Sequence, residues 1–430
     1  MNLVRSIARA MGQRALRAVC HIALAALVAF AARAAEGPLT LDAAIEHALR
    51  DAPQVAGAQA SLEGAQAYQP SAGRLPDPEL IVGVDNLPVN GPDQFSMTRD
   101  FMTMSKVGVM QTVPAGAKRR YRAEAASREV DVAMSELRAA RFQTASAAAE
   151  AWISLAVADE TLERVRALKS DLSVQSATAR AALSSGRGTA GDALASDATL
   201  ARLDNQVLEL EQQRAMRRAE LGRWIGDEAS QELGDLPWKR ELAVAPELLI
   251  EDVASHPPLA PIAAKLEAAK TEVDLARAER RSDWSAELSF AKRGPDYSDM
   301  VSLEFRVGLP LFEKNRQNPV IAAKLAGVRA DEAELDAELR MHRAEIESMV
   351  AMWRSGRQRL EHFESTLLPL ARDRSRAVLT GYGSGRGDLR AVLDALRDEV
   401  DLQREYVSLE GDVTRAWTFL HLLHSSGATP

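Results

Sequence analysis

The chain has 430 residues, of which 53 are Lys or Arg and 61 are Asp or Glu, giving a formal net charge of −8. An acidic surface repels a phosphate backbone, so nucleic acid is excluded as an expected partner. With Cys20 as its single cysteine, the chain has no disulfide framework.

The first 35 residues are expected to form a cleaved secretory signal peptide. Four arginines precede an apolar run at residues 19–30, and Ala32-Arg33-Ala34 then supplies small residues at the two positions that a signal peptidase requires. The apolar run is too short to span a bilayer as a helix. Cleavage after residue 34 would remove Cys20 and five arginines, leaving a net charge of −13. The mature protein would fold without disulfides beyond the inner membrane.

The sequence Ser-Gly-Arg-Gly occurs twice, at residues 185–188 and 384–387. Each copy lies between two long helix-compatible stretches, so the match indicates an internal duplication. The predicted domains are listed in chain order: the signal peptide at 1–35, a first repeat at 36–226, a link at 227–245, a second repeat at 246–424 and a tail at 425–430.

The first repeat is predicted to contain a long antiparallel helical hairpin. Residues 117–185 contain neither Gly nor Pro and are rich in strong helix formers. An unbroken helix of that length would extend roughly 100 Å. Residues 190–225 are expected to return as a second helix, and the apolar stripes of both favour a coiled coil.

The second repeat follows the same plan, with an outgoing helix at 320–380 and a returning one at 388–423. Gly327, Gly356 and Pro369 are expected to interrupt the outgoing helix, and Pro369 to kink it.

A shorter amphipathic helix is expected before each hairpin, at residues 41–68 and 246–280, with Thr40 as the N-cap of the first. Two alternating segments follow each short helix. They are predicted to be strands, apolar on one face and polar on the other, and their positions are 80–84, 107–113, 284–291 and 301–309.

Strands of about ten residues are long enough to cross a bilayer when tilted. Four strands cannot close a barrel, and an open sheet edge in lipid is prohibitively costly. The chain is therefore expected to share a barrel with copies of itself. Two copies would supply eight strands and three would supply twelve, and only the wider barrel leaves an open lumen. Three copies are favoured.

The turn of the second repeat carries a motif, Tyr382-Gly383-Ser384-Gly385 followed by Val392-Leu393-Asp394-Ala395. Together with the signal peptide and the duplicated hairpins, it resembles the TolC-type outer-membrane efflux proteins over essentially the whole mature chain. The first copy departs from the motif, since Leu183 stands where an aromatic is usual, before Gly186 and Asp192. Three further segments are similar to the branch that exports heavy-metal cations: Asp85-Asn86-Leu87-Pro88, Phe101-Met102-Thr103-Met104 and Gly108-Val109-Met110-Gln111.

The resemblance implies a fold and a set of partners. The fold would be mainly α with a small β part, in which the hairpins of a homotrimer form an α-barrel tunnel in the periplasm. The four strands of each chain would contribute to a shared 12-stranded barrel in the outer membrane of a Gram-negative cell, in contact with lipid. A periplasmic adaptor would dock on the tunnel tip, and an inner-membrane pump of the RND type would supply substrate and energy. No catalysis and no cofactor are implied.

Candidate site residues fall into three groups. The tip turns are the expected adaptor-docking sites, and their residues are Ser185, Gly186, Arg187, Gly188, Ser384, Gly385, Arg386 and Gly387. By motif position, Asp192 and Tyr382 correspond to residues that hold the aperture closed in the family, and Arg386 and Asp388 lie beside them. The predicted lumen charges are Glu287, Glu304 and Arg306, where acidic rings can favour cations.

Four methionines, Met97, Met102, Met104 and Met110, are compatible with a soft metal ion, because thioethers favour Cu(I). Packing or lipid contact is the alternative reading, since Met is an adaptable filler.

Other classes of function remain to be weighed. Periplasmic adaptors usually have one hairpin flanked by small β-domains, whereas this chain has two hairpins and four membrane-length strands. An enzyme is disfavoured because no nucleophile–base cluster, phosphate loop or metal quartet is found. An outer-membrane channel for heavy-metal cations is therefore predicted, with a channel for drugs or type I protein secretion as the alternative.

Overall fold

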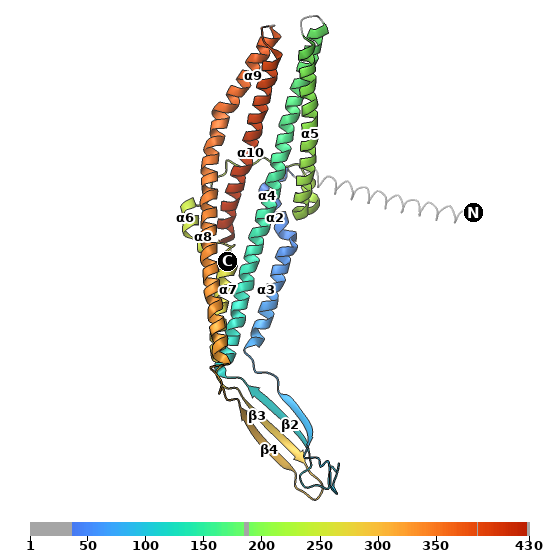
Figure 1. Ribbon diagram of the computed structural model, residues 1–430, viewed down its shortest axis with the longest axis vertical. Helices are drawn as coiled ribbons and strands as arrows, with labels where there is room; N and C mark the ends of the chain where they lie inside the picture. Colours follow the sequence, from blue (N-terminus) through green and yellow to red (C-terminus); the bar gives the residue numbers. More distant parts are fainter. Residues whose placement is uncertain (1–36, 185–188, 385, 428–430) are drawn as a thin grey trace, which may run out of the picture. The chain divides into compact units, whose positions relative to one another are not determined.

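The computed structural model describes residues 37–184, 189–384 and 386–427 (Figure 1). The expected signal peptide, residues 185–188 of the first turn and Gly385 lie outside this part of the chain. The fold is mainly helical with one four-stranded sheet, as predicted. None of the helices in the described part is both long and apolar enough to cross a membrane.

The chain forms two compact units. The helical unit comprises the described residues of Met1–Arg50, Ala147–Arg240 and Trp353–Arg415. The sheet unit comprises those of Asp51–Ser146, Glu241–Met352 and Ala416–Pro430. Both repeats contribute to each unit, so neither unit corresponds to one repeat.

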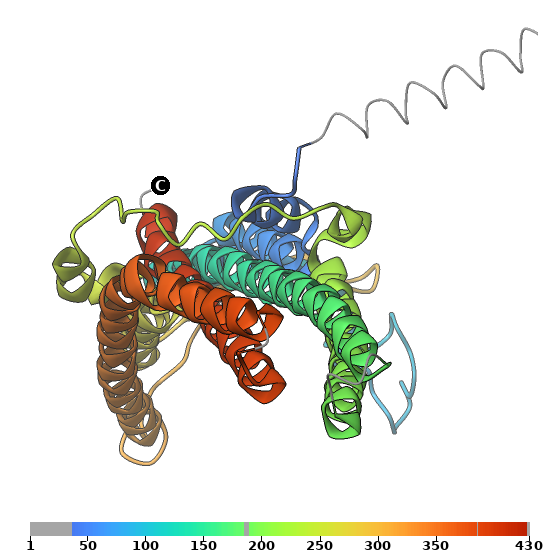
Figure 2. The same ribbon diagram turned by 90° about the horizontal axis from the view of Figure 1, so that it is seen from above.

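Two long helical hairpins dominate the structure. In the first, α4 (Gly116–Ser184) runs for 69 residues and α5 (Ala190–Ile225) returns. In the second, α8 (Gln317–His362) and α9 (Leu368–Gly383) run outward and α10 (Leu389–Gly427) returns. Seen from above in Figure 2, α4 with α5 and α9 with α10 appear as adjacent helix pairs. The predicted hairpins are confirmed.

One hydrophobic core joins the two hairpins within the helical unit. Its buried members are Leu162, Val165, Leu168 and Leu172 of α4, Leu203, Val207 and Leu210 of α5, and Leu389, Val392, Leu393, Leu396 and Val400 of α10. Fully burying each such side chain contributes about 1.5–3 kcal/mol. The apolar stripes therefore hold the hairpins together as well as closing each one.

The expected interruptions of the second outgoing helix are partly wrong. α8 passes through Gly327 and Gly356 without a break. Gly356 instead allows a close approach of α10, because a Cβ there would overlap the Val413 side chain. The interruption is a π-helical turn at Phe363–Leu367, directly before Pro369 in the first turn of α9. The backbone is helical on both sides of the π turn, at His362 and at Leu368, so Pro369 lies within a continuous helix and removes one of its hydrogen bonds.

Each short helix is divided in two by proline. The first comprises α2 (Leu41–Asp51) and α3 (Pro53–Ala72), because a residue before proline favours extended backbone and Ala52 has ψ of 117°. The second comprises α6 (Pro246–Glu251), a 3₁₀ turn (Val253–Ser255) and α7 (Ala260–Ala278). The predicted cap is present, since Thr40 Oγ1 accepts a hydrogen bond from the Ala43 N–H at 3.2 Å.

In the sheet unit, the short helices pack on the long ones in the same way in both repeats. Leu62 of α3 is buried against Leu137 of α4, and Leu266 of α7 against Val328 of α8. The link between the repeats begins with a 3₁₀ turn (Gly226–Ser230) and then pairs with the start of the chain through the Leu39–Leu233 bridge, in the helical unit.

The sheet is antiparallel, with the strand order β1-β2-β3-β4. The strands are β1 (Glu79–Asp85), β2 (Met104–Val113), β3 (Trp284–Lys292) and β4 (Met300–Val307). The central β2–β3 pair joins the two repeats into one sheet. β1 and β4 are the edges, and each has a strand partner on one side only within the described residues.

The turn between α9 and α10 is tightly closed. The backbone N–H of Arg386 donates to the Gly381 carbonyl at 3.0 Å, and the Ser384 hydroxyl donates to the same carbonyl at 2.9 Å. A Cβ at Gly387 would lie 2.7 Å from the Tyr382 backbone nitrogen. Because the obstacle is backbone, only glycine fits at position 387 without rearrangement.

We expect Gly387→Ala to loosen this turn and to speed its cleavage by a protease of broad specificity at least several-fold. Gly383→Ala is the matched control, because nothing lies within 4 Å of a Cβ placed there. Limited proteolysis followed by mass spectrometry would measure both rates. Equal cleavage of the two variants would contradict the steric argument.

Candidate functional site

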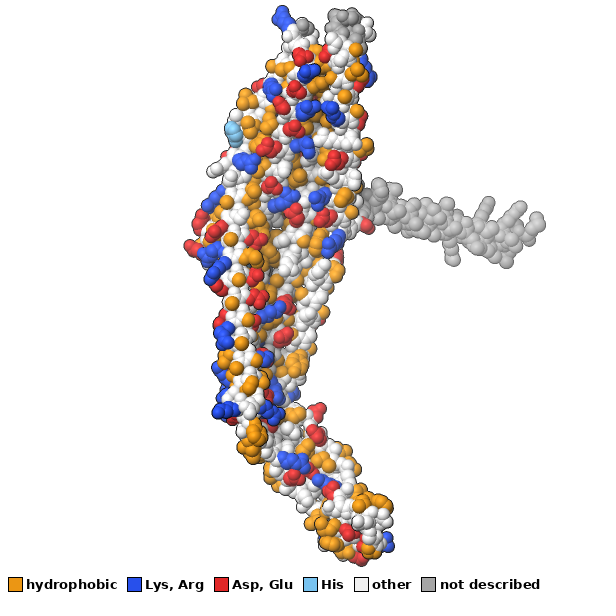
Figure 3. Space-filling model, viewed as in Figure 1, with side chains coloured by type: hydrophobic (Ala, Val, Ile, Leu, Met, Phe, Trp, Pro, Cys, Tyr) orange, Lys and Arg blue, Asp and Glu red, His pale blue; other side chains and the backbone are white. Residues whose placement is uncertain are grey.

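One face of the sheet is apolar and exposed. Its side chains are between 43% and 73% exposed, and they are Leu80, Val82, Val84, Val107, Val109, Trp284, Leu288, Phe290, Val301, Leu303, Phe305 and Val307. The register places Leu80, Val109, Leu288 and Leu303 in one row across all four strands. Figure 3 shows apolar and charged side chains together over the region of the sheet. A contiguous apolar surface of this kind indicates contact with lipid or protein.

The opposite face carries a compact charged cluster around Glu287. The Glu287 side chain is only 3% exposed and lies 2.5 Å from Lys106 Nζ and 2.8 Å from Arg306 Nη2. Arg306 also contacts Glu304 at 2.7 Å. Two cations therefore compensate two carboxylates, and the pairing relieves the large cost of burying the charge of Glu287.

The structure brings together all three predicted lumen charges, and it adds Lys106. Arg306 Nη1 also donates to Met110 Sδ at 3.1 Å. The sequence analysis did not assign Lys106 to this cluster. Alternation of apolar and polar residues along a strand indicates which face a side chain lies on, but it does not give the register between neighbouring strands. The position of Lys106 in β2, one residue before Val107, was the available signal for its face.

The other three methionines of the predicted set lie before β2 or at its start. Met97 and Met102 are 44% and 47% exposed in the segment between β1 and β2, and Met104 begins β2. Across residues 37–184, 189–384 and 386–427, no group of three or more His, Cys, Asp or Glu residues could hold a metal ion.

At the tip, the predicted aperture residues make local contacts. Asp192 forms a capping box with Thr189: Thr189 Oγ1 accepts from the Asp192 N–H at 3.1 Å, and Asp192 Oδ2 accepts from the Thr189 N–H at 3.3 Å. The Thr-x-x-Asp spacing was the sequence signal for this role. The capping box positions the Asp192 carboxylate at the start of α5.

The second turn holds the remaining candidates. Tyr382 is half-buried against the hydrophobic core of the helical unit. Asp388 is exposed and accepts a hydrogen bond from the Arg390 N–H at 3.3 Å, next to the start of α10. The Arg386 side chain is exposed, while its backbone closes the turn.

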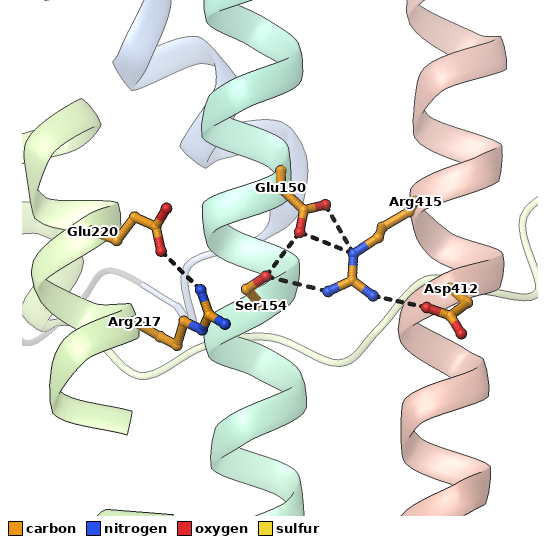
Figure 4. Close-up of polar contacts among 6 residues, drawn as sticks. All are labelled: Glu150, Ser154, Arg217, Glu220, Asp412 and Arg415. Carbon is orange, nitrogen blue, oxygen red and sulfur yellow. Dashed lines mark hydrogen bonds and ion pairs between the residues drawn. The ribbon is translucent and has the colours of Figure 1, made fainter. Parts of the chain in front are cut away.

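An ionic network joins the two hairpins within the helical unit (Figure 4). Arg415 of α10 contacts both oxygens of Glu150 of α4, at 3.0 and 2.8 Å, and it also contacts Asp412 at 3.0 Å. Ser154 accepts a further hydrogen bond from Arg415 at 3.2 Å. Both Glu150 oxygens accept from Nε of Arg415, while Nη1 donates to Asp412 and Nη2 to Ser154. All three guanidinium nitrogens are therefore engaged, which constrains the relative position of the two helices.

A second polar cluster in the helical unit was missed at the sequence level. Glu410 of α10 is 7% exposed and lines a cavity of about 540 Å3 with Tyr406, Glu364 and the link residue Lys239. The Tyr406 hydroxyl donates to Glu364 at 3.0 Å, and Lys239 lies 3.1 Å from Glu364. Glu364 belongs to the π-helical turn.

Burial, reinforced by the charge of Glu160, raises the pKa of Glu410 from 4.5 to about 7, although Tyr406 and Arg164 partly offset this. The folded protein therefore binds this proton more tightly than the unfolded chain does. The free energy of unfolding should fall as the pH rises from about 4.5 to 7, by at most roughly 3 kcal/mol.

We expect Glu410→Gln to reduce this decline, because the neutral amide cannot ionise. Thermal unfolding measured between pH 5 and pH 8 should show a smaller loss of Tm in the variant than in the wild type. Glu405→Gln is the control, since Glu405 is an exposed residue of the same helix. Parallel pH profiles for the wild type and Glu410→Gln would contradict the assignment.

Comparisons of the sequence and of the structure show which known proteins this chain resembles. No protein-family model matches the chain. The chain is 27% identical over 399 residues to the cobalt-zinc-cadmium resistance protein CzcC of Cupriavidus metallidurans, covering 90% of each sequence.

Solved structures show the fold. The outer membrane protein VceC of Vibrio cholerae has a TM-score of 0.75 at 22% identity, covering 90% of this chain and 96% of VceC. CusC has a TM-score of 0.78 at 13% identity, covering 91% of this chain and 93% of CusC. The predicted resemblance is thus confirmed: the chain has the fold of the TolC-type outer-membrane efflux proteins and is similar to CzcC over nine-tenths of its length.

Proposed function

We propose that the chain is the outer-membrane channel subunit of a tripartite efflux system. The observation that carries the proposal is the two-faced sheet, whose apolar face is exposed while its opposite face carries a compensated charge cluster around the buried Glu287. An apolar outer face and a polar inner face are what a pore wall in a bilayer requires. The similarity to CzcC and the fold shared with VceC and CusC support the same assignment.

The proposed assembly is a homotrimer. Within residues 37–184, 189–384 and 386–427, β1 and β4 each leave one row of backbone groups without a strand partner, and such groups are costly in lipid. Pairing β4 of one copy with β1 of the next satisfies both edges. Three copies provide twelve strands around a lumen, which the Glu287 cluster would face.

The helical hairpins would form the periplasmic tunnel. Its two kinds of turn, residues 185–188 and 384–387, would meet a periplasmic adaptor, which connects the channel to an inner-membrane pump of the RND type. The steric restriction at Gly387 supports docking of the adaptor on a turn of fixed shape, because the backbone of the turn excludes any side chain at this position. The subunit would conduct without catalysis, with the energy supplied by the pump.

We infer heavy-metal cations as the substrate class, supported by the name and extent of the match to CzcC. The lumen cluster carries Lys106 and Arg306 opposite Glu287 and Glu304, so it has no net charge to select cations. Selection would therefore rest with the pump and adaptor. A channel for drugs or protein secretion differs from this proposal only in those partners.

The proposed function can be tested in the cell and after purification. Deleting the gene should increase sensitivity to cobalt, zinc or cadmium, and restoring it should reverse the effect. The mature protein should fractionate with outer membranes as a trimer that conducts ions in planar bilayers. A soluble periplasmic monomer would contradict the channel, and sensitivity to organic drugs alone would contradict the substrate class.

For the aperture, we expect Asp192→Ala to raise single-channel conductance, because it removes a carboxylate near the tip. The substitution also removes the N3 side chain of the capping box, although Thr189 Oγ1 can still accept from the backbone N–H of residue 192. Thr189→Ala is the matched control, since it breaks the same capping box and keeps the charge. Equal conductance in the two variants would assign Asp192 to capping alone. Tyr382→Ala should raise conductance as well if the ring narrows the aperture.

A further inference from the structure

Asp77 and Asp283 occupy equivalent positions in the two repeats. α3 ends at Ala72 and α7 ends at Ala278, so each aspartate lies five residues beyond its helix. The local sequences, Arg-Leu-Pro-Asp at 74–77 and Arg-Arg-Ser-Asp at 280–283, begin and end alike. Each then leads into a strand with the same alternation of exposed apolar side chains.

Within the chain, Asp283 connects the two repeats. Its Oδ1 accepts a hydrogen bond from the Ala115 N–H at 2.9 Å, and its Oδ2 accepts one from Lys118 Nζ at 3.0 Å. Ala115 is the residue directly before α4. Because β2 and β3 are antiparallel neighbours, the residue before β3 reaches the segment that follows β2. Asp283 therefore places negative charge at the N-terminus of α4, where the helix dipole favours it.

Asp77 has no such place within its own chain. It precedes β1, and β1 lies at the opposite edge of the sheet from β4. The Asp77 carboxylate is exposed and makes no hydrogen bond or ion pair with any residue that the structure describes.

The segment that corresponds to the Asp283 site lies after β4, at the start of α8, and it has free polar groups. Counted from Pro310 as from Pro114, Lys314 is the counterpart of Lys118, and Arg316 lies two residues further on, directly before α8. Both side chains are exposed without a partner among the described residues. The Gln317 Oε1 atom is buried without a hydrogen-bond donor in the same part of the chain. Arg316 and Gln317 line a cavity of about 510 Å3 with Leu309 and Pro310, the counterparts of Val113 and Pro114.

We propose that Asp77 of a second copy binds at the start of α8, beside Arg316, in the way that Asp283 binds at the start of α4. The occupant is a second copy of this chain, because pairing of β4 with its β1 brings Asp77 to Leu309-Pro310, as pairing of β3 with β2 brings Asp283 to Val113-Pro114. The charges of Asp77 and Arg316 are complementary. The inference rests on the proposed assembly and adds the contact that sets its register.

Cysteine cross-linking tests the contact directly in the full chain. Cys20 is replaced by Ser, so that the only thiols are those of Asp77→Cys and Arg316→Cys. Mild oxidation or a short bismaleimide should convert most of the double variant into covalent dimers and trimers on denaturing gels. Each single variant is the control and should stay monomeric on the same gels.

Charge reversal gives an independent measurement. Asp77→Arg and Arg316→Asp should each lower the temperature at which the oligomer dissociates, and the two changes combined should restore most of that loss. Asp77→Arg combined with Arg329→Asp is the matched control, because it makes the same charge changes with an exposed cation of α8 that lies thirteen residues beyond Arg316. Restoration by Arg316→Asp and not by Arg329→Asp is the expected result.

The outcomes separate this inference from the proposed function. The contact would be overturned, and the channel left in place, by the following result. The oligomer is intact and conducts, its double-cysteine variant does not cross-link, and Asp77→Arg does not change its dissociation temperature. A wild-type chain that remains monomeric would overturn both.

Discussion

The unsatisfied backbone at the two edges of the sheet is the constraint on which the proposed assembly depends. A strand edge in water can bind solvent, but in the proposed assembly the apolar face of this sheet contacts lipid. Backbone N–H and C=O groups cannot remain unpaired there, and the chain has no fifth strand among its described residues to cover them. In that assembly the edge strands of one copy would be paired by the edge strands of neighbouring copies. The pairing of β2 with β3 within the chain is the model for this contact, because β4 of one copy would pair with β1 of the next in the same way.

The same logic connects the sheet to the helices. The strands end where the long helices begin, and the Asp283–Ala115 hydrogen bond fixes one such junction to its neighbour. Further along, the core that joins α4, α5 and α10 and the contact of Arg415 Nε with Glu150 hold the outgoing helix of one repeat to the returning helix of the other. Contacts between the repeats, rather than within them, thus carry much of the organisation of each unit.

Sequence predicted the elements that depend on local composition. The absence of Gly and Pro placed the first long helix within one residue of its observed bounds, and alternation identified all four strands. Sequence-based prediction failed where the role of a residue depends on contacts with residues that are distant in the sequence. Gly356 reads as a helix breaker, but the closeness of Val413 explains it. Lys106 and Glu287 meet through a register that no single strand encodes. Glu410 has the sequence context of a surface acid, and only packing of the link and the π-helical turn around it buries the side chain.

The π-helical turn at Phe363–Leu367 makes the outgoing helix of the second repeat structurally different from that of the first. A π turn accommodates one extra residue, and each residue advances an α-helix by about 100°. The side chains of α9 are therefore rotated relative to those of α8, whereas α4 keeps a single phase over its whole length. The duplicated hairpins have consequently lost their equivalence at this point. Neighbouring outgoing helices in an assembled ring would present different faces to one another, so the ring would alternate between two kinds of seam.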